Sequence, residues 1–194
     1  MEKTITRVHY TALLDNFRDF DLIILPMSFN EYLQILEIDA GSKHINRNSL
    51  LNDYMSETSF PQGIKLKQSN PGAQARYLQA IYNTVIEKDI VQRYKLRNVR
   101  AFSNVLKYIA GNIGSPASPN NIAKALKTDG QPVDNKTVEA YLRYLTDSFV
   151  LYQASRFDIK GKQQLATQEK YYLADVGLRN ILLGKNSFQD IGHT

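Results

Sequence analysis

The amino-acid sequence predicts a mainly α-helical protein with a small β component. Apolar residues recur at three- and four-residue steps over 73–94 and 99–112, which is the spacing of a single helix face. Residues with N-capping side chains precede four further helix-like stretches. Strand-like stretches are short and lie only at 21–25, 149–154 and 171–173.

The first predicted elements lie before residue 73. Asp21–Leu25, closed by Pro26, predicts a short buried strand. Ser28 and Glu31 have the capping-box spacing, so we expect a helix that begins there and runs to about Ile38. The following stretches are predicted as a loop over 39–48, a helix over 48–57 that stops before Phe60-Pro61, and a surface crossing over 65–72.

Two strongly periodic helices come next, Ala73–Tyr94 and Val99–Asn112. The second carries Phe102, Val105, Leu106 and Ile109 in one register. A domain boundary is predicted between these helices, near Arg97-Asn98, which divides the chain into 1–97 and 98–194.

The second unit opens with capped helices. Ser118 begins a short helix with Pro119 in its first turn. After a loop over 128–132, Asp134 can cap a third helix that holds Val138, Tyr141, Leu142 and Leu145 on one face.

Two strands and a last helix complete this unit. In the strand over 149–154 we expect Phe149 and Leu151 to face one side and Val150 and Tyr152 the other. A polar stretch over 158–169 leads to a return strand at Tyr171–Leu173. Asp175 then caps a helix over 176–183, which Gly184 ends.

This order of elements is typical of a winged helix-turn-helix domain. In that arrangement the third helix enters the major groove of DNA and the hairpin lies along the backbone. The turn before the third helix is longer than in the tightest helix-turn-helix units, which weighs mildly against direct docking on DNA.

Composition excludes several classes of protein. Because no apolar run reaches 18 residues, we expect no transmembrane span and no membrane partner. The start of the sequence has no apolar segment of a secretory signal, so a cytoplasmic location is predicted. Cysteine is absent, which excludes disulfides and thiolate chemistry. His9, His44 and His193 lack ligand spacing, so no metal site is predicted.

The net charge of +5 is modestly basic. Residues 1–97 hold 12 basic and 11 acidic residues, a net of +1, whereas 98–175 hold 10 and 7, a net of +3. The small excess therefore lies in the unit where contacts with phosphates would matter.

Several segments resemble a family of bacterial and archaeal AAA-type ATPases. Ile23–Leu33 resembles the segment that leaves the ATPase core, and Tyr82–Tyr94 is similar to the long lid-side helix. Thr137–Leu145 and Arg156–Asp158 resemble the winged-helix region, and Lys170–Leu178 resembles the strand and helix after it. The resemblance covers roughly 21–192. It implies an ATPase-core remnant and a helical lid-like segment in 1–97, and a winged-helix domain with a C-terminal helix in 98–194.

The sequence also departs from that family. Members begin with a P-loop, but Gly161-Lys162 is followed by Gln163, and Gly184-Lys185 has its upstream Gly177 at the wrong spacing. Thr58-Ser59-Phe60-Pro61 stands where the family usually has Gly-Gly-Phe-Pro. The family's nuclease-like C-terminal region is missing too. We therefore expect a fragment that is not an enzyme and binds no cofactor, whereas the parent family uses ATP and magnesium.

Candidate DNA-binding residues lie on the third helix and the wing. Asn135, Lys136 and Thr137 begin the helix, and Arg143 lies about two turns further on. An equally weighted alternative is a solvated helix that mediates protein contacts. Lys160 and Lys162 at the wing tip could contact phosphates or form an ordinary basic surface.

Other sharp interpretations are weaker. Arg93 and Arg97 could act as an arginine finger on a neighbouring nucleotide, but cations at a helix C-terminus are the simpler explanation. Asp175 could be read as a catalytic acid or a metal ligand, but it stands where a helix N-cap belongs. The tyrosines and phenylalanines are mostly explained by helix faces, so the sequence predicts no stacking surface for single-stranded nucleic acid.

The leading function is a non-catalytic module that binds or positions double-stranded DNA for an AAA-type ATPase. The alternative is a module for protein interaction or oligomerisation, or a regulatory lid acting in trans on a partner ATPase. Val8, Leu13, Leu14 and Phe17 lack a sheet to cover, which predicts a homo-oligomer assembled through the first forty or so residues.

Overall fold

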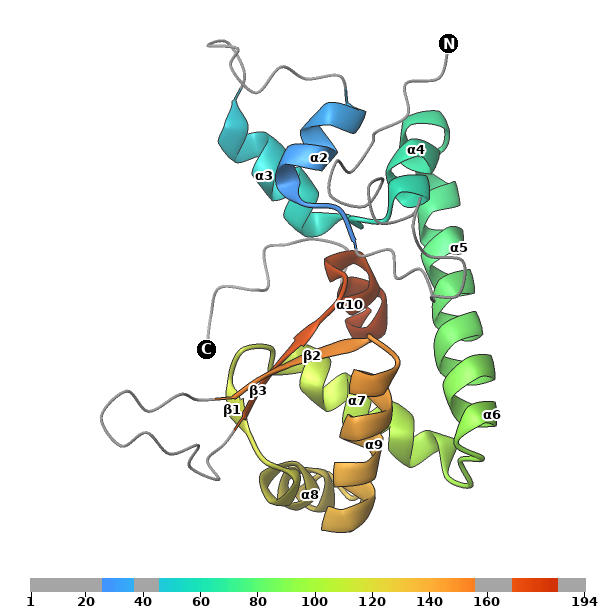
Figure 1. The fold of residues 1–194 in the computed structure, drawn as a ribbon, viewed down its shortest axis with the longest axis vertical. Helices are drawn as coiled ribbons and strands as arrows, with labels where there is room; N and C mark the ends of the chain where they lie inside the picture. The colour runs from blue at the N-terminus through green and yellow to red at the C-terminus, as the bar shows by residue number, and fades with distance from the viewer. Residues whose placement is uncertain (1–25, 37–45, 156–168, 185–194) are drawn as a thin grey trace, which may run out of the picture.

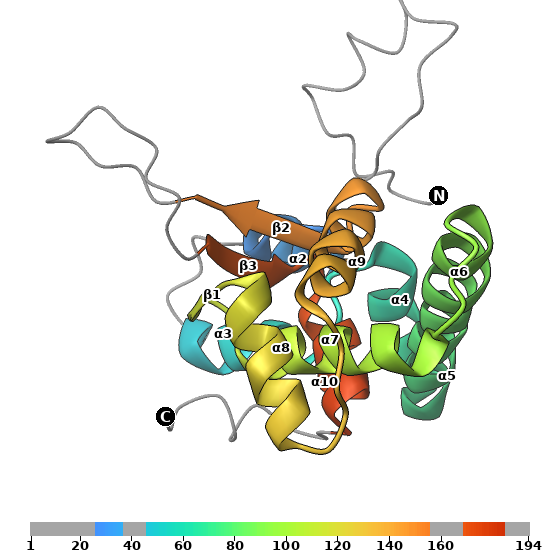
Figure 2. The ribbon, with the colours of Figure 1, turned by 90° about the horizontal axis from the view of Figure 1, so that it is seen from below.

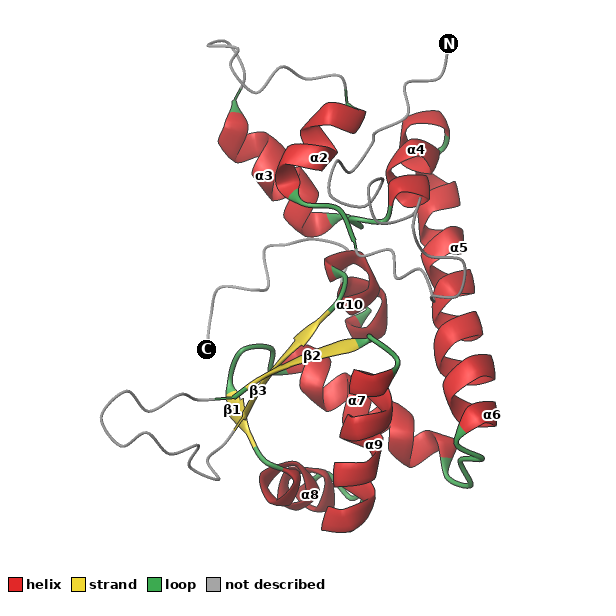
Figure 3. Ribbon diagram, in the orientation of Figure 1, coloured by secondary structure: helices red, strands yellow, loops and turns green. Residues whose placement is uncertain are grey.

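The structure is a computed structural model that describes residues 26–36, 46–155 and 169–184. It is mainly helical with one small sheet (Figures 1 and 3). The described elements are α2 (Phe29–Ile35), α3 (Arg47–Ser56), α4 (Pro61–Ser69), α5 (Pro71–Tyr82), the π-helical segment η1 (Asn83–Ile90), α6 (Val91–Arg93), α7 (Val99–Gly111), β1 (Pro116–Ala117), α8 (Pro119–Thr128), α9 (Asn135–Asp147), β2 (Leu151–Ala154), β3 (Glu169–Leu173) and α10 (Val176–Leu183).

The capping box predicted for the first helix is confirmed. The Glu31 amide donates to the Ser28 hydroxyl at 3.4 Å, and the Ser28 amide donates to the Glu31 carboxylate at 2.8 Å. Helix α2 ends at Ile35, earlier than expected. Helix α3 follows the predicted range closely. The predicted strand at 21–25, most of the predicted loop and the apolar residues proposed for self-association lie outside the described residues.

The prediction of a surface crossing over 65–72 is wrong. Helix α4 occupies 61–69, and only Asn70 separates it from α5. Pro61 lies in the first turn of α4, where a fixed φ suits a helix and the missing N–H costs nothing. Ile64 is buried against Tyr32 and Leu33 of α2. Tertiary packing therefore stabilises a helix whose own sequence is polar and weakly periodic.

Helices α5, η1 and α6 form one continuous rod that covers the helix predicted over 73–94. Its middle section adopts π-helical hydrogen bonding, which the 3.6-residue pattern does not reveal. Leu78, Ile86 and Ile90 are buried along it. In both ribbon views the rod and the sheet lie on opposite sides of α7 and α9 (Figures 1 and 2).

The larger core is assembled from helices and one face of the sheet. Phe102, Val105 and Leu106 of α7 are fully buried, as predicted, and Leu145 of α9 joins them. Ile86 and Ile90 also belong to this core, so the end of the rod packs with the second unit rather than the first. A separate small cluster holds Met27, Tyr32, Leu33 and Ile64.

The sheet has the order β1-β3-β2, and both pairings are antiparallel. Leu151 and Tyr171 turn their side chains into the core. The predicted orientation of Phe149 and Val150 is wrong, because Phe149 is 49% exposed and Val150 only 4%. The Val150 amide donates to the Leu145 carbonyl at 3.0 Å and Phe149 has φ 55°, the Schellman geometry that ends α9.

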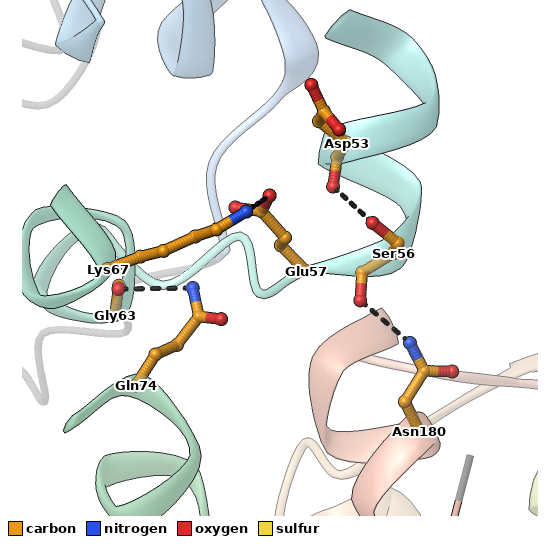
Figure 4. A network of polar contacts seen from close by, with 7 residues as sticks. All are labelled: Asp53, Ser56, Glu57, Gly63, Lys67, Gln74 and Asn180. Carbon is orange, nitrogen blue, oxygen red and sulfur yellow. Dashed lines mark hydrogen bonds and ion pairs between the residues drawn. The ribbon is translucent and has the colours of Figure 1, made fainter. Parts of the chain in front are cut away.

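Helix α10 joins the two clusters. Its N-cap is Asp175, as predicted, because the Leu178 amide donates to that carboxylate at 2.8 Å, and Gly184 ends the helix with φ 63°. The Asn180 amide group donates to the Ser56 carbonyl at 3.0 Å (Figure 4). Beside this contact Glu57 forms an ion pair with Lys67 (Figure 4).

Candidate nucleic-acid interface

Helix α9 carries most of the candidate residues, and its buried face fixes which of them reach solvent. Val138, Tyr141, Leu142 and Leu145 are buried on one side. This apolar stripe anchors the helix in the larger core. The opposite side exposes Asn135, Lys136, Glu139, Arg143 and Asp147.

The first turn of α9 is tied to its own cap. The Thr137 amide donates to one oxygen of the Asp134 carboxylate at 3.0 Å, and the Thr137 hydroxyl donates to the other. These two hydrogen bonds lower the pKa of Asp134. Thr137 is therefore committed to capping, whereas Asn135 and Lys136 are exposed beside it.

Arg143 is exposed and lies over an aromatic ring. Its guanidinium carbon is 5.6 Å from the centre of the Tyr144 ring. Tyr144 in turn stacks on Tyr94 at the end of the rod, with 3.8 Å between ring centres and 14° between planes. The Tyr141 hydroxyl also donates to the Asn98 carbonyl at 3.3 Å. The Tyr94–Tyr144 stack holds α9 against the end of the rod, and the Tyr141 hydrogen bond holds it against the start of α7.

A cleft with a volume of about 1260 Å³ lies between α9, the start of α8 and the sheet. Arg143 lines it together with Glu139 and Asp147 of α9 and Glu169 and Lys170 of β3. The signs of charge alternate along the exposed side of α9, from Lys136 through Glu139 and Arg143 to Asp147. Acidic groups therefore weaken the positive potential that phosphates would meet there.

Arg93 and Arg97, two further candidates, do not line this cleft. Lys160 and Lys162 lie outside the described residues. Arg93 is exposed on α6 and forms a two-point ion pair with Asp89, at 3.1 and 3.2 Å. Arg97 is exposed in the connection before α7.

The structure also reveals surface residues that the sequence did not single out. Phe149, Tyr152 and Tyr172 are exposed although they are large aromatic side chains. Tyr152 and Tyr172 are direct partners across β2 and β3. The one sequence signal for these residues is strand alternation. It correctly places Tyr152 and Leu151 on opposite faces of the sheet, but it does not specify the register between the strands.

The described part of the chain holds neither a candidate metal site nor a candidate membrane-spanning helix. It contains no group of three or more His, Cys, Asp or Glu residues that could hold a metal ion. None of its helices combines the length and apolarity that crossing a bilayer requires.

Comparison with known proteins identifies the family. Residues 48–189 match a family described as a domain of unknown function (DUF8612). Because the match covers well over half of the chain, the protein belongs to this family.

Two uncharacterised proteins are similar to the chain. One, from Haemophilus influenzae, is 29% identical over 174 residues, which are 90% of this chain and 42% of that protein. The other, from Methanocaldococcus jannaschii, is 22% identical over 171 residues, 86% of this chain and 38% of that protein. The chain thus spans about two fifths of the length of these relatives. No solved structure matches.

Proposed function

We propose that residues 98–184 form a winged helix-turn-helix module that binds or positions duplex DNA without catalysing a reaction. The element order α7-β1-α8-α9-β2-β3 and the sheet order β1-β3-β2 support this proposal. The observation that carries it is the exposed row Asn135, Lys136 and Arg143 on α9, beside a cleft bordered by the sheet.

The proposal includes a cytoplasmic location and a relationship to AAA-type ATPases. The relationship rests on the residue resemblance alone. No P-loop is present in this sequence, so ATP and magnesium would bind in another part of a longer parent protein. Accordingly, ATP with magnesium should produce neither a thermal shift nor hydrolysis above background with this chain. Binding of ATP by the isolated chain at micromolar concentration would contradict this assignment.

Salt dependence tests the DNA proposal directly. If Lys136, Arg143 and the wing residues Lys160 and Lys162 contact phosphates, the log–log slope of affinity against salt should be about −3 to −4. Removing any one cation by substitution to Ala should flatten the slope by about one unit on every duplex sequence. Asn135→Ala should instead relax any sequence preference, because an amide can read an adenine edge.

A matched control comes from the rod. Arg76 is exposed on α5, so Arg76→Ala removes the same charge away from the cleft and should leave DNA affinity unchanged. Neither Lys136 nor Arg143 lies on the buried face of α9, so their substitution should change stability by no more than about 0.5 kcal/mol. A folded variant with all four cations reversed that binds DNA as well as the parent would exclude the proposal.

The alternating charges on α9 favour one competing function, a module for protein interaction or oligomerisation. Glu139 and Asp147 lie on the same exposed side as the cations and line the same cleft. Such a pattern suits a partner surface with both signs of charge. This function takes the lead if the charge-reversed variant loses binding to a partner chain but not to DNA.

A regulatory lid acting in trans remains the third proposal, and it rests on Arg93 and Arg97. The exposed Arg93–Asp89 ion pair contributes only about 0.3–0.5 kcal/mol to the stability of the helix. An incoming phosphate could therefore displace Asp89 from Arg93. Arg93→Ala should then lower the ATPase rate of a mixed complex with an intact partner ATPase, whereas Arg76→Ala should not.

A further inference from the structure

The sheet has a second face that the core does not use. Leu151, Tyr171 and Leu173 point inward, so strand alternation turns Tyr152, Ala154, Lys170 and Tyr172 outward. Tyr152 is paired with Tyr172, and Ala154 with Lys170. Helices α7 and α9 pack on the inward side. Tyr152 and Tyr172 do not line the cleft at α9, whereas Ala154 and Lys170 do.

The two tyrosines form an exposed aromatic pair on the outer face. Tyr152 is 39% exposed and Tyr172 is 40% exposed. Directly paired residues on one face lie close enough for their rings to offer one continuous surface. Tyr172 extends over the backbone of Gly114, where an added Cβ would come within 3.3 Å of the ring.

The neighbours of the pair are small or positively charged. Pro116 pairs with Lys170 on the β1 side and is exposed, and Ala154 lies on the β2 side. Lys170 is the single charged residue on the outer face of the described strands, because Glu169 points inward and accepts a hydrogen bond from the Tyr171 hydroxyl at 2.9 Å. The outer face of the described strands therefore combines exposed aromatic side chains, small neighbouring residues and one positive charge.

We propose that the outer face of the sheet binds single-stranded nucleic acid, with bases stacked on Tyr152 and Tyr172 and a phosphate near Lys170. Proteins that bind single strands without strong sequence preference use this combination of aromatic platforms and cations. An apolar protein partner would not require the lysine, and a basic partner would be repelled by it. Lys170 also lines the cleft at α9, but Tyr152 and Tyr172 belong to neither α9 nor the cleft lining, so the tyrosine variants distinguish this inference from duplex binding by α9.

The absence of tryptophan from the chain permits a clean test. Tyr172→Trp places the sole indole on the proposed platform, and stacking of a base on it should quench its fluorescence. The probe is an oligothymidylate about 15 nucleotides long. The matched control is Leu51→Trp, because Leu51 is exposed on α3, away from the sheet.

Saturable quenching of the indole in the Tyr172→Trp variant but not in the control, with competition by unlabelled oligothymidylate, would support the proposal. In the otherwise native chain, Tyr152→Ala and Tyr172→Ala should each weaken binding about five- to hundredfold, whereas the Tyr→Phe changes should retain it. Lys170→Ala should flatten the salt slope by about 0.7. Lys136→Ala should leave single-strand binding unchanged, which separates this site from α9.

Three results would overturn it. The first is the absence of quenching at about 100-fold excess of oligothymidylate over protein, in a Tyr172→Trp variant whose melting temperature equals that of the parent. The second is unchanged affinity in the folded Tyr152→Ala, Tyr172→Ala double variant. The third is self-association of the parent that this double variant abolishes while nucleic acid has no effect, because the face would then join two copies of the chain.

Discussion

Asp175 and Ser59, 116 residues apart in the sequence, are joined by two hydrogen bonds. The amide and the hydroxyl of Ser59 both donate to one oxygen of the Asp175 carboxylate at 2.8 Å. The Thr58 hydroxyl donates to the same oxygen at 3.0 Å, and the Leu178 amide donates to the other. Asp175 is only 1% exposed, so one buried carboxylate caps α10 and fastens it to the segment after α3.

This arrangement predicts a large loss of stability when the carboxylate is removed. Asp175→Ala leaves several buried donors without an acceptor, so the free energy of unfolding should fall by about 3 kcal/mol or more. Ser59→Ala removes one donor and should cost about 1 kcal/mol. Urea unfolding measures both. The control is Asp134→Ala, an exposed N-cap without distant partners, which should have a clearly smaller effect; an equal loss would contradict the fastening role.

Gly177 and Gly111 should respond in opposite ways to alanine. A Cβ at Gly177 would lie 2.9 Å from both Cα and Cβ of Thr58, so Gly177→Ala should destabilise by about 1–3 kcal/mol through overpacking. A Cβ at Gly111, in the last turn of α7, meets nothing within 4 Å, and Gly111→Ala should stabilise by up to about 1 kcal/mol. Thermal unfolding of the two variants measures both effects. Equal shifts in melting temperature would contradict the close contact at Gly177.

Phe149 should be a position where glycine is better than alanine. Its φ of 55° is left-handed, a conformation that disfavours any residue with a Cβ. Phe149→Gly should therefore be about 1 kcal/mol more stable than Phe149→Ala, although glycine is the more flexible residue in the unfolded chain. Urea unfolding of the two variants gives the difference directly. A more stable alanine variant would show that this Schellman geometry is not formed.

The cap of α9 should weaken in acid. The hydrogen bonds from Thr137 lower the pKa of Asp134 below its ordinary value of 3.8. A lowered folded-state pKa means that the stabilisation is complete above the unfolded-state value and is lost as the pH falls through the folded-state pKa. The difference in melting temperature between the parent and Asp134→Ala should thus be full near neutral pH and shrink below 3.8.

Asp134→Asn is the control for this pH dependence. An asparagine side chain caps a helix about as well as aspartate but does not titrate. Its advantage over Asp134→Ala should therefore persist in acid. If the parent keeps its full advantage at the lowest pH at which it stays folded, the carboxylate is not the group that titrates.

Local sequence patterns predicted the parts of the fold that depend only on residues close together in the sequence. The caps at Ser28, Ser118, Asp134 and Asp175 are each made by an amide three residues further on. The buried face of α7 also follows from spacing alone. Capping and helix periodicity require no distant partner, so the sequence by itself determined them, together with which side of α9 faces solvent.

Only the tertiary structure decided the features that depend on distant contacts. Helix α4 forms because Ile64 is buried against α2, and the long-range partners of Asp175, Thr58 and Ser59, lie more than a hundred residues earlier in the sequence. The pairing of Tyr152 with Tyr172 depends on the register between strands, which neither strand specifies alone. Such contacts have energies set by packing and burial between segments, and no local pattern of residues encodes them.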